Sequence, residues 1–430
     1  MLKITCEGVY YKNGGFVPAK DGPAAGLPAP EKAREGTMAH AILKAHNTGD
    51  NMEELAIRFD AMASHDITYV GIIQTARASG MQAFPLPYVL TNCHNSLCAV
   101  GGTINEDDHV FGLSAAKKYG GEFVPAHQSV IHSYMRERYA APGRMILGSD
   151  SHTRYGAYGT MAIGEGGPEL ARQLLSKTYN IPYPKVIAIY LTGTPIPGVG
   201  PQDVALELIR STFKDGVVKN AVMEFFGPGV ANLSMDYRSG IDVMTTETTC
   251  LSSIWPADHT LKAHLAVLGR GEAFKPQAPA DGAYYDGLIE VELDKIRPMI
   301  ALPFHPSNAY TIQEFQENLD ELLHQVDEDT VRQLKLKNRP ASLREKIVDG
   351  KFRVDQGVIA GCSGGTYQNI VRAAQILDGR AIGSGEFWLS VYPTSQPVNL
   401  ELTRRGYIAS LMAAGASIRS CFCGPCFGAG

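Results

Sequence analysis

Apolar positions recur along the chain in two alternating patterns. Apolar residues follow helical spacing over residues 32–46, and Asp50 is placed to cap a second helix that runs through 52–57. Later in the chain, β-branched and aliphatic runs at 144–147 and 185–191 alternate with helical patterns at 169–177 and 204–213. Short strands that alternate with helices are typical of sheets covered by helices, so the pattern predicts an α/β fold.

Proline and glycine divide this pattern into three parts. The segment 192–201 (TGTPIPGVGP) can extend neither a strand nor a helix, and the segment 303–306 (PFHP) precedes a charged, helix-rich stretch over 311–346. The α/β pattern returns from Lys351. We therefore expect three α/β domains, at residues 1–198, 199–305 and 306–430.

Composition limits the class of protein. Of the 430 residues, 44% are hydrophobic and 19% are charged, which fits a soluble globular protein and excludes disorder of the whole chain. The net charge is −5 without a polybasic run, so small polar substrates fit better than nucleic acid or an anionic membrane. The first 15 residues have no signal-peptide pattern and no apolar run approaches about 18 residues, so a cytoplasmic location is expected.

The cysteines carry the clearest chemical signal. Eight cysteines in so long a chain are too few and too unevenly spaced for a disulfide scaffold, so reduced thiols are expected. Cys423-Gly-Pro-Cys426 aims two thiolates at one point, and Cys362 follows a predicted strand in a glycine-rich loop. Three thiolates would leave one corner of a four-iron cluster without a protein ligand. Because Cys421 lies beside this pair, the spacing leaves open a zinc site of three or four thiolates or a redox dithiol.

A second chemical motif lies at the end of the predicted strand at 144–147. Gly148-Ser-Asp-Ser-His-Thr153 places Asp150, Ser151 and His152 where open α/β folds expose side chains to a ligand crevice. A carboxylate close to an imidazole can hold it in one tautomer and leave the other nitrogen for proton transfer. The alternative is a turn in which Asp150 and Ser151 only accept bonds from backbone amides.

Several motifs in order resemble one family. The segments Val130-Ile-His132, Tyr139-Ala-Ala-Pro-Gly143 and Gly148–Thr153 are followed by Gly227-Pro-Gly-Val230, Glu247, and the three cysteines at 362, 423 and 426. On these motifs the chain is identified as a member of the aconitase superfamily of iron–sulfur hydro-lyases, of a diverged bacterial hydratase type, from about residue 32 to the end. The resemblance implies a three-domain core of α/β/α layers around a central [4Fe-4S] cleft, without the swivel domain.

The resemblance also implies roles for single residues. Cys362, Cys423 and Cys426 would bind a [4Fe-4S] cluster whose fourth iron takes the hydroxyl and carboxylate of a hydroxy di- or tricarboxylic acid. The implied catalytic residues are His94, His132, Asp150, His152 and Glu247. His65 and Ser151 would contact substrate, and Cys421 would be a bystander. Dehydration needs a Lewis acid for the hydroxyl and an imidazole that protonates the leaving oxygen, and this set supplies both.

Some positions depart from the family pattern. The family's Asp-His pair falls at Cys93-His94-Asn95, an Asn of the family is Val243, and the residues after the first cluster cysteine are Ser363 and Gly364. These substitutions predict a cleft with fewer polar contacts. The resemblance also predicts a swivel domain, in the same longer chain or as a separate subunit. The alternative function is a non-catalytic iron–sulfur sensor or regulatory protein of the same fold. Its RNA-binding version fits poorly with the weak basic character.

Overall fold

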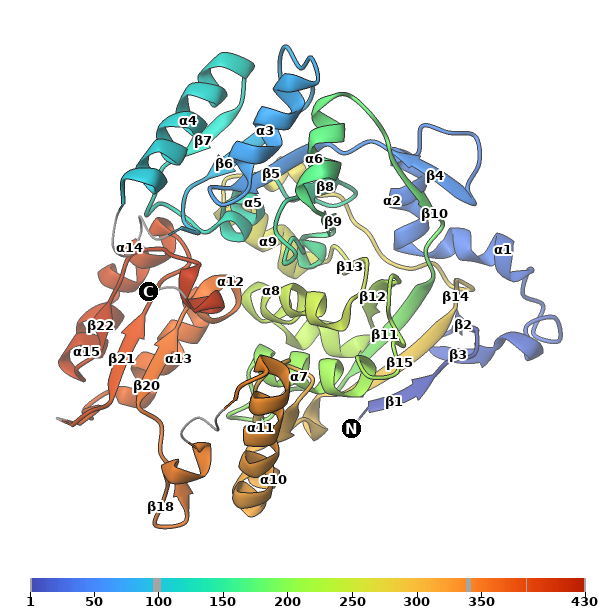
Figure 1. The fold of residues 1–430 in the computed structure, drawn as a ribbon. Helices are drawn as coiled ribbons and strands as arrows, with labels where there is room; N and C mark the ends of the chain where they lie inside the picture. The colour runs from blue at the N-terminus through green and yellow to red at the C-terminus, as the bar shows by residue number, and fades with distance from the viewer. Residues whose placement is uncertain (1, 96–101, 338–341, 384, 429–430) are drawn as a thin grey trace.

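Parallel strands organise the chain into three sheets of the α/β class, with helices packed around them (Figure 1). The computed structural model describes residues 2–95, 102–337, 342–383 and 385–428. None of the helices in these ranges combines the length and the apolar character that a membrane crossing requires. The α/β class predicted from the sequence is confirmed.

The first sheet has the strand order β7-β6-β5-β8-β9, and all neighbours are parallel. Its strands are β5 (Ala61–His65), β6 (Tyr88–Thr91), β7 (Glu122–Val124), β8 (Met145–Gly148) and β9 (Met161–Gly164). They are linked by helices α3 (Tyr69–Ala78), α4 (Thr103–Tyr119) and α5 (Ile131–Arg138), and α6 (Gly167–Leu174) follows β9. The chain leaves β5 toward one edge and returns at β8 to build the other edge. Such a switch point is where open α/β sheets bind ligands.

The second sheet has the order β1-β15-β11-β12-β13. Its strands are β1 (Leu2–Thr5), β11 (Val186–Thr192), β12 (Val222–Phe226), β13 (Ser252–Ile254) and β15 (Gly287–Glu292), of which only β1 is antiparallel to its neighbour. The helices of this part are α7 (Pro201–Thr212), α8 (Met235–Met244) and α9 (His259–Val267). This sheet pairs strands from both sides of the domain limit expected at residue 198. The two limits between the expected domains, at 198/199 and 305/306, stay predictions.

The third sheet has the order β20-β21-β22 and is also parallel. Its strands are β20 (Gln356–Ile359), β21 (Trp388–Val391) and β22 (Ser417–Ile418), and they pack with α13 (Tyr367–Leu377), α14 (Gln396–Arg404) and α15 (Tyr407–Ala413). The helices α10 (Ile312–Glu317) and α11 (Leu319–Leu334) connect the second sheet to this unit. They account for the helix-rich segment expected over 311–346.

Short elements complete the chain. The pairs are β4 (Glu54–Ile57) with β10 (Tyr179–Pro182), β16 (Met299–Ala301) with β17 (Ala309–Thr311), and β18 (Ile347–Val348) with β19 (Lys351–Phe352). The strands β2 (Val9–Lys12), β3 (Gly15–Pro18) and β14 (Tyr284–Tyr285) form a small antiparallel sheet. The short helices α1 (Pro30–Ala33) and α12 (Gly361–Gly364) flank longer elements.

One predicted helix is wrong. Residues 54–57 form strand β4, which pairs antiparallel with β10, instead of the helix expected over 52–57. Leu55 and Ile57 are buried while Glu54 is exposed, which is the two-residue period of a strand. The helix expected over 32–46 is interrupted at Gly36, and Thr37 caps α2 (Met38–His46) by accepting a bond from the amide of His40.

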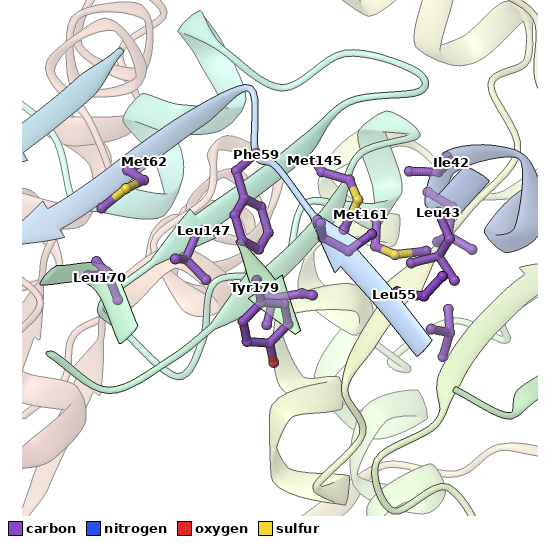
Figure 2. Close-up of a cluster of buried hydrophobic side chains, with 14 of the residues drawn as sticks. Ile42, Leu43, Leu55, Phe59, Met62, Met145, Leu147, Met161, Leu170 and Tyr179 are labelled. Atoms are coloured by element: carbon purple, nitrogen blue, oxygen red, sulfur yellow. The ribbon is translucent and has the colours of Figure 1, made fainter. Parts of the chain in front are cut away.

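A continuous apolar core joins the first sheet to the elements around it. Figure 2 shows Phe59 and Tyr179 facing one another among methionine and leucine side chains from β5, β8, β9 and α6. The two rings have centroids 5.6 Å apart. Each buried Leu, Ile or Met side chain contributes about 1.5–3 kcal/mol to stability, so this core holds the switch-point strands rigidly.

A buried ion pair fixes the start of α9 against α8. Arg238 is fully buried, and its guanidinium donates to both carboxylate oxygens of Asp258, at 2.9 and 2.7 Å. Asp258 also caps α9 by accepting bonds from the amides of Thr260 and Leu261. The carboxylate therefore satisfies a buried cation and a helix end together.

We expect Asp258→Ala to lower the free energy of unfolding by about 3 kcal/mol, because it leaves the Arg238 charge buried without a partner. Urea denaturation followed by circular dichroism measures this loss. Glu292→Ala is the control, since its pair with Lys295 is exposed and its loss should change the free energy of unfolding by less than about 1 kcal/mol. Equal losses in both variants would contradict the role given to the buried pair.

Candidate active site

The carboxyl ends of three neighbouring strands bring two histidines and an aspartate together. His65 is the last residue of β5, His94 follows β6, and Asp150 follows β8. The Nε2 atoms of His65 and His94 lie 3.6 and 3.2 Å from Asp150 Oδ2. These strands flank the switch point of the first sheet, so the fold itself gathers side chains that lie far apart in the sequence.

Asp150 is the centre of this cluster. Its Oδ1 accepts a hydrogen bond from His132 Nε2 at 3.1 Å and another from the backbone amide of His152 at 2.7 Å. Burial works against ionisation, but the interactions with His132, His152 and His94 outweigh it and hold the pKa of Asp150 far below its usual range. Asp150 is therefore an anion at neutral pH.

Two of the imidazoles around Asp150 are neutral at neutral pH. Burial lowers the pKa of His132 to about 4, and burial with the neighbouring His94 lowers the pKa of His65 to about 3. A carboxylate can only accept, so the proton of His132 lies on Nε2, and its Nδ1 is placed to accept from the Tyr155 hydroxyl at 3.2 Å. Asp150 thus selects one tautomer of His132, whereas the sequence motif predicted this role toward His152, whose backbone amide donates to the same oxygen.

His152 differs from these histidines because it has two acidic partners. Its Nε2 lies 2.8 Å from Glu247 Oε1, in the short helical turn that follows α8. Burial alone would lower its pKa, but hydrogen bonds with Asp150 and Glu247 raise it to about 9. The bond with His152 in turn lowers the pKa of Glu247. At neutral pH the pair is an imidazolium and a carboxylate, and His152 carries a proton that it can donate.

A fifth imidazole reaches this pair from the loop between β16 and β17. His305 Nε2 lies 3.8 Å from Glu247 Oε2, and its ring stacks on Phe213. The amide of Ser307 donates to His305 Nδ1, so Nδ1 is an acceptor and the ring proton lies on Nε2, facing Glu247. The sequence pattern of this PFHP segment predicted only a domain boundary, and no role was predicted for His305. A histidine between two prolines was the available signal.

Backbone amides are also fixed in this site. Asp66, directly after β5, accepts bonds from the amides of His94 and Asn95 at 3.1 and 3.2 Å and from His109 Nε2 at 2.9 Å. Asp66 thereby fixes the segment His94-Asn95, which stands where the family pattern has an Asp-His pair. His94 itself stacks on His65, with ring centroids 4.2 Å apart and planes at 12°.

The three predicted cluster cysteines come from the carboxyl ends of the third sheet. Cys362 follows β20 in α12, while Cys423 and Cys426 follow β22. The thiols of Cys423 and Cys426 hydrogen-bond to one another, and Cys426 interacts electrostatically with Cys362. A Cβ added to Gly361, the first residue of α12, would lie 2.4 Å from Cys426 Sγ. Gly361 also has φ = +78°, so only glycine suits this approach.

Backbone bonds dock this cysteine group on the histidine cluster. The amide of Cys423 donates to the carbonyl of Cys93, the residue before His94, at 2.8 Å. The amide of Val130 donates to the carbonyl of Thr394, just after β21, at 3.0 Å. Cys426 interacts electrostatically with His152, His94 and Asp150. The structure therefore brings every predicted site residue into one region between the first and third sheets.

The thiols are suited to bind a cationic metal group. Burial raises the pKa of Cys362 to about 12, while the hydrogen bond from Cys423 lowers the pKa of Cys426 to about 7. A bound metal group would reverse the burial cost of the thiolates, because thiols that bind metals lose their protons. Cys421 is buried as well, but its sulfur lies 3.7 Å from the carbonyl oxygen of Gln128, and His127 pairs with its backbone. The donor set and the glycine beside it fit an iron–sulfur cluster held by three cysteines.

A cavity of about 470 Å³ opens beside these groups. It is lined by His65, Ser149, Asp150, Ser151, Gly164, Glu165 and Gly166. The Thr246 hydroxyl donates to the Ser151 carbonyl at 2.6 Å and joins this rim to the Glu247 turn. The predicted substrate contacts His65 and Ser151 thus face a space large enough for a small polycarboxylic acid.

His65, His94 and Asp150 also have the donor types and spacing of a mononuclear metal site. The ring geometry argues against it. A metal binds a histidine near the plane of its ring, whereas the planes of His65 and His94 are nearly parallel and stacked. No point at bonding distance lies in both planes, so we assign these side chains to the carboxylate cluster.

The state of His152 gives a measurable pH dependence. Its folded pKa of about 9 lies above the unfolded value of about 6.5, so the protonated ring favours the folded state. This contribution is complete below about pH 6.5 and is lost as the pH rises through about 9. The side chain is 39% exposed, so solvent screens part of the effect.

We expect the His152 imidazole carbon resonances to titrate near pH 9 in ¹³C-histidine-labelled protein, and Glu247→Gln to lower this midpoint toward 6.5. Ser151→Ala is the control, because the Ser151 hydroxyl is 3.4 Å from His152 Nδ1 and carries no charge. A midpoint near 6.5 in the unmodified protein, or no change in the Glu247 variant, would contradict the assigned ion pair.

Comparison with known proteins places this geometry in a family. The sequence model of the Aconitase family (aconitate hydratase) matches residues 40–430. The chain is 30% identical over 395 residues to the mitochondrial aconitate hydratase of Schizosaccharomyces pombe, covering 87% of this chain and 46% of that protein. It is 28% identical over 419 residues to the probable mitochondrial aconitate hydratase of Dictyostelium discoideum, covering 91% and 50%. The chain thus spans about half the length of these relatives. With almost its whole length matched by the family model, the chain belongs to the aconitase family.

Proposed function

We propose that this chain is the cluster-binding part of an aconitase-like hydro-lyase or isomerase that dehydrates and rehydrates a hydroxy di- or tricarboxylic acid. The single observation that carries the proposal is that Cys362, Cys423 and Cys426 gather beside the Asp150 histidine cluster and its cavity. Family membership supports the same class of reaction, since the matched relatives are named aconitate hydratases.

Cys362, Cys423 and Cys426 would hold a [4Fe-4S] cluster. When bound, the cluster would supply a Lewis acid with one position open for the substrate hydroxyl and carboxylate. A zinc ion held by the same thiols would bring no inorganic sulfide, so sulfide analysis distinguishes a zinc site from an iron–sulfur cluster. Cys421 stays outside this ligand set in the proposal, because its sulfur faces the Gln128 carbonyl.

The histidine cluster would manage the protons of the reaction. His152 is an imidazolium at neutral pH, so it is suited to protonate the departing hydroxyl and release it as water. Glu247 holds the imidazolium, and Asp150 orients both His132 and the backbone of His152. His94 replaces an acidic residue of the family pattern, and it stacks on His65, which lines the cavity. In the hydration direction the same groups accept these protons back.

A swivel domain would complete the site, either in a longer chain or as a separate subunit, and would supply the base that removes the substrate proton. The cavity is large enough for a small hydroxy-carboxylate as substrate. A cytoplasmic location and the absence of a nucleic-acid partner remain predictions.

The test is turnover by the cluster-loaded protein together with its swivel domain. Citrate, isocitrate, 2-methylcitrate and isopropylmalate are supplied anaerobically, and the unsaturated acid is followed by its ultraviolet absorbance. The proposal predicts turnover of at least one of them, lost on Asp150→Asn. An intact cluster without turnover of any of these acids would overturn the enzymatic proposal and favour the iron–sulfur sensor.

A further inference from the structure

A buried arginine lies directly behind the proposed cluster site. Arg136 is on α5, one helical turn after His132, and only 4% of its surface is exposed. Its Nη1 donates to the carbonyl oxygen of Cys362 at 3.1 Å. Its Nη2 lies 3.4 Å from the carbonyl oxygens of Arg154 and Ser239. The guanidinium therefore bonds to the backbone of a proposed cluster ligand.

This guanidinium has no anionic partner within bonding distance in the part of the chain that the structure describes. All its acceptors there are neutral carbonyls, and its Nε has no hydrogen-bond partner. An arginine keeps its charge in proteins, and burial of a charge without a counter-charge is costly. Something close to Arg136 must offset that cost.

The nearby carboxyl groups do not fill this role. Asp242 is fully buried and interacts electrostatically with Arg136, but no hydrogen bond joins the two side chains among the described residues; its Oδ1 accepts from Ser253 and Trp255 Nε1, and burial raises its pKa. Glu137 accepts a bond from the Ser395 hydroxyl, and burial raises its pKa as well. Asp150 is an anion as well, but it already bonds to His132 and to the amide of His152. The proposed thiolates at Cys362, Cys423 and Cys426 are the other concentration of negative charge near Arg136.

We propose that Arg136 is the internal counter-charge of the cluster and sets its reduction potential. The inference rests on the cluster proposed above. Three thiolates make the assembly anionic, and reduction adds one more negative charge. A buried cation next to one ligand favours the more negative, reduced form, so it raises the potential and also favours assembly. Arg136 acts through its bond to the Cys362 carbonyl and through the electrostatic field of its charge. It is therefore a positioning residue and does not contact the substrate.

The chain contains a matched control. Arg154 is also 4% exposed and donates only to carbonyl oxygens, those of Thr153 and Cys250, and its Nε also lacks a hydrogen-bond partner among the described residues. None of its acceptors belongs to a proposed cluster ligand. A general effect of removing a buried arginine should therefore appear in both positions, and an effect on the cluster only at Arg136.

The experiment is an anaerobic redox titration of the reconstituted protein, followed by electron paramagnetic resonance and visible absorbance. At a fixed potential, Arg136→Gln and Arg136→Met should lower the reduced-to-oxidised ratio roughly tenfold, a shift of about 59 mV to more negative potential for one electron. Arg136→Lys keeps the charge and should stay near the unmodified protein, as should Arg154→Gln. Methionine leaves no unpaired amide in the interior, so it tests the charge even where glutamine disturbs folding.

The outcomes separate the two proposals. Folded Arg136→Met that no longer assembles the cluster, while Arg136→Lys does, also supports the counter-charge role. An unchanged midpoint in Arg136→Gln and Arg136→Met, or an equal shift in Arg154→Gln, overturns it and leaves the cluster proposal standing. Unmodified protein that takes up no iron and sulfide overturns the cluster and the inference together.

Discussion

Replacing Cys362, Cys423 or Cys426 by serine is expected to abolish the iron–sulfur cluster in each single variant. A serine hydroxyl is a far weaker ligand for iron than a thiolate, and each of these sulfurs would supply one of only three protein ligands. Visible absorbance of anaerobically reconstituted protein, with iron and acid-labile sulfide analysis, measures the loss. Each variant should be nearly colourless and retain less than about a tenth of the iron.

Cys421→Ser is the matched control for this series. Cys421 is buried, as Cys362 and Cys423 are, and lies only two residues from Cys423, but its sulfur faces the carbonyl of Gln128. A hydroxyl can make the same contact, so this variant should keep the cluster. Loss of the cluster from Cys421→Ser together with its retention in Cys426→Ser would show that the ligand set is wrong.

Asp150→Asn is expected to give the second large effect, a fall in turnover of about 10²–10⁴-fold with little change in cluster content. The amide lacks the negative charge that holds the histidines, and its N–H₂ group takes the place of Oδ2, which His65 and His94 Nε2 face at 3.6 and 3.2 Å. The loss of charged hydrogen bonds should lower the free energy of unfolding by about 1.5–3 kcal/mol. Steady-state kinetics and urea denaturation measure the two effects.

Glu165→Gln provides the comparison for Asp150→Asn. Glu165 lines the same cavity, but its side chain accepts a bond from the Tyr179 hydroxyl, and no hydrogen bond joins it to an imidazole in the described part of the chain. This variant should change turnover by less than about tenfold. If the Asp150 and Glu165 variants lost turnover equally, a general charge effect on the cavity would replace the specific role of Asp150.

The position of one site motif could be predicted from the sequence because it lies at a strand end. Asp150 and His152 follow a short aliphatic run, and the structure places them directly after β8 at the switch point of the first sheet. The α/β class followed from the same alternation of strands and helices. These features are local, so the pattern of one segment contains them.

Other features could not be predicted because they depend on contacts between distant segments. Nothing near His305 or Arg136 shows that one faces Glu247 and the other bonds to the Cys362 carbonyl, 226 positions away. The pairing of β11 with β12 across residue 198 likewise depends on the sheet and not on the Pro/Gly-rich loop. The wrong helix at 52–57 was a short apolar run, and pairing with β10 decided its conformation.

The central claim is that sulfurs from the ends of β20 and β22 share one iron–sulfur core. Iron, acid-labile sulfide and zinc analysis of the anaerobically purified protein tests it most directly. The claim predicts a brown protein with roughly four iron and four sulfide per chain and no stoichiometric zinc. A colourless protein with about one zinc per chain and no sulfide would contradict it.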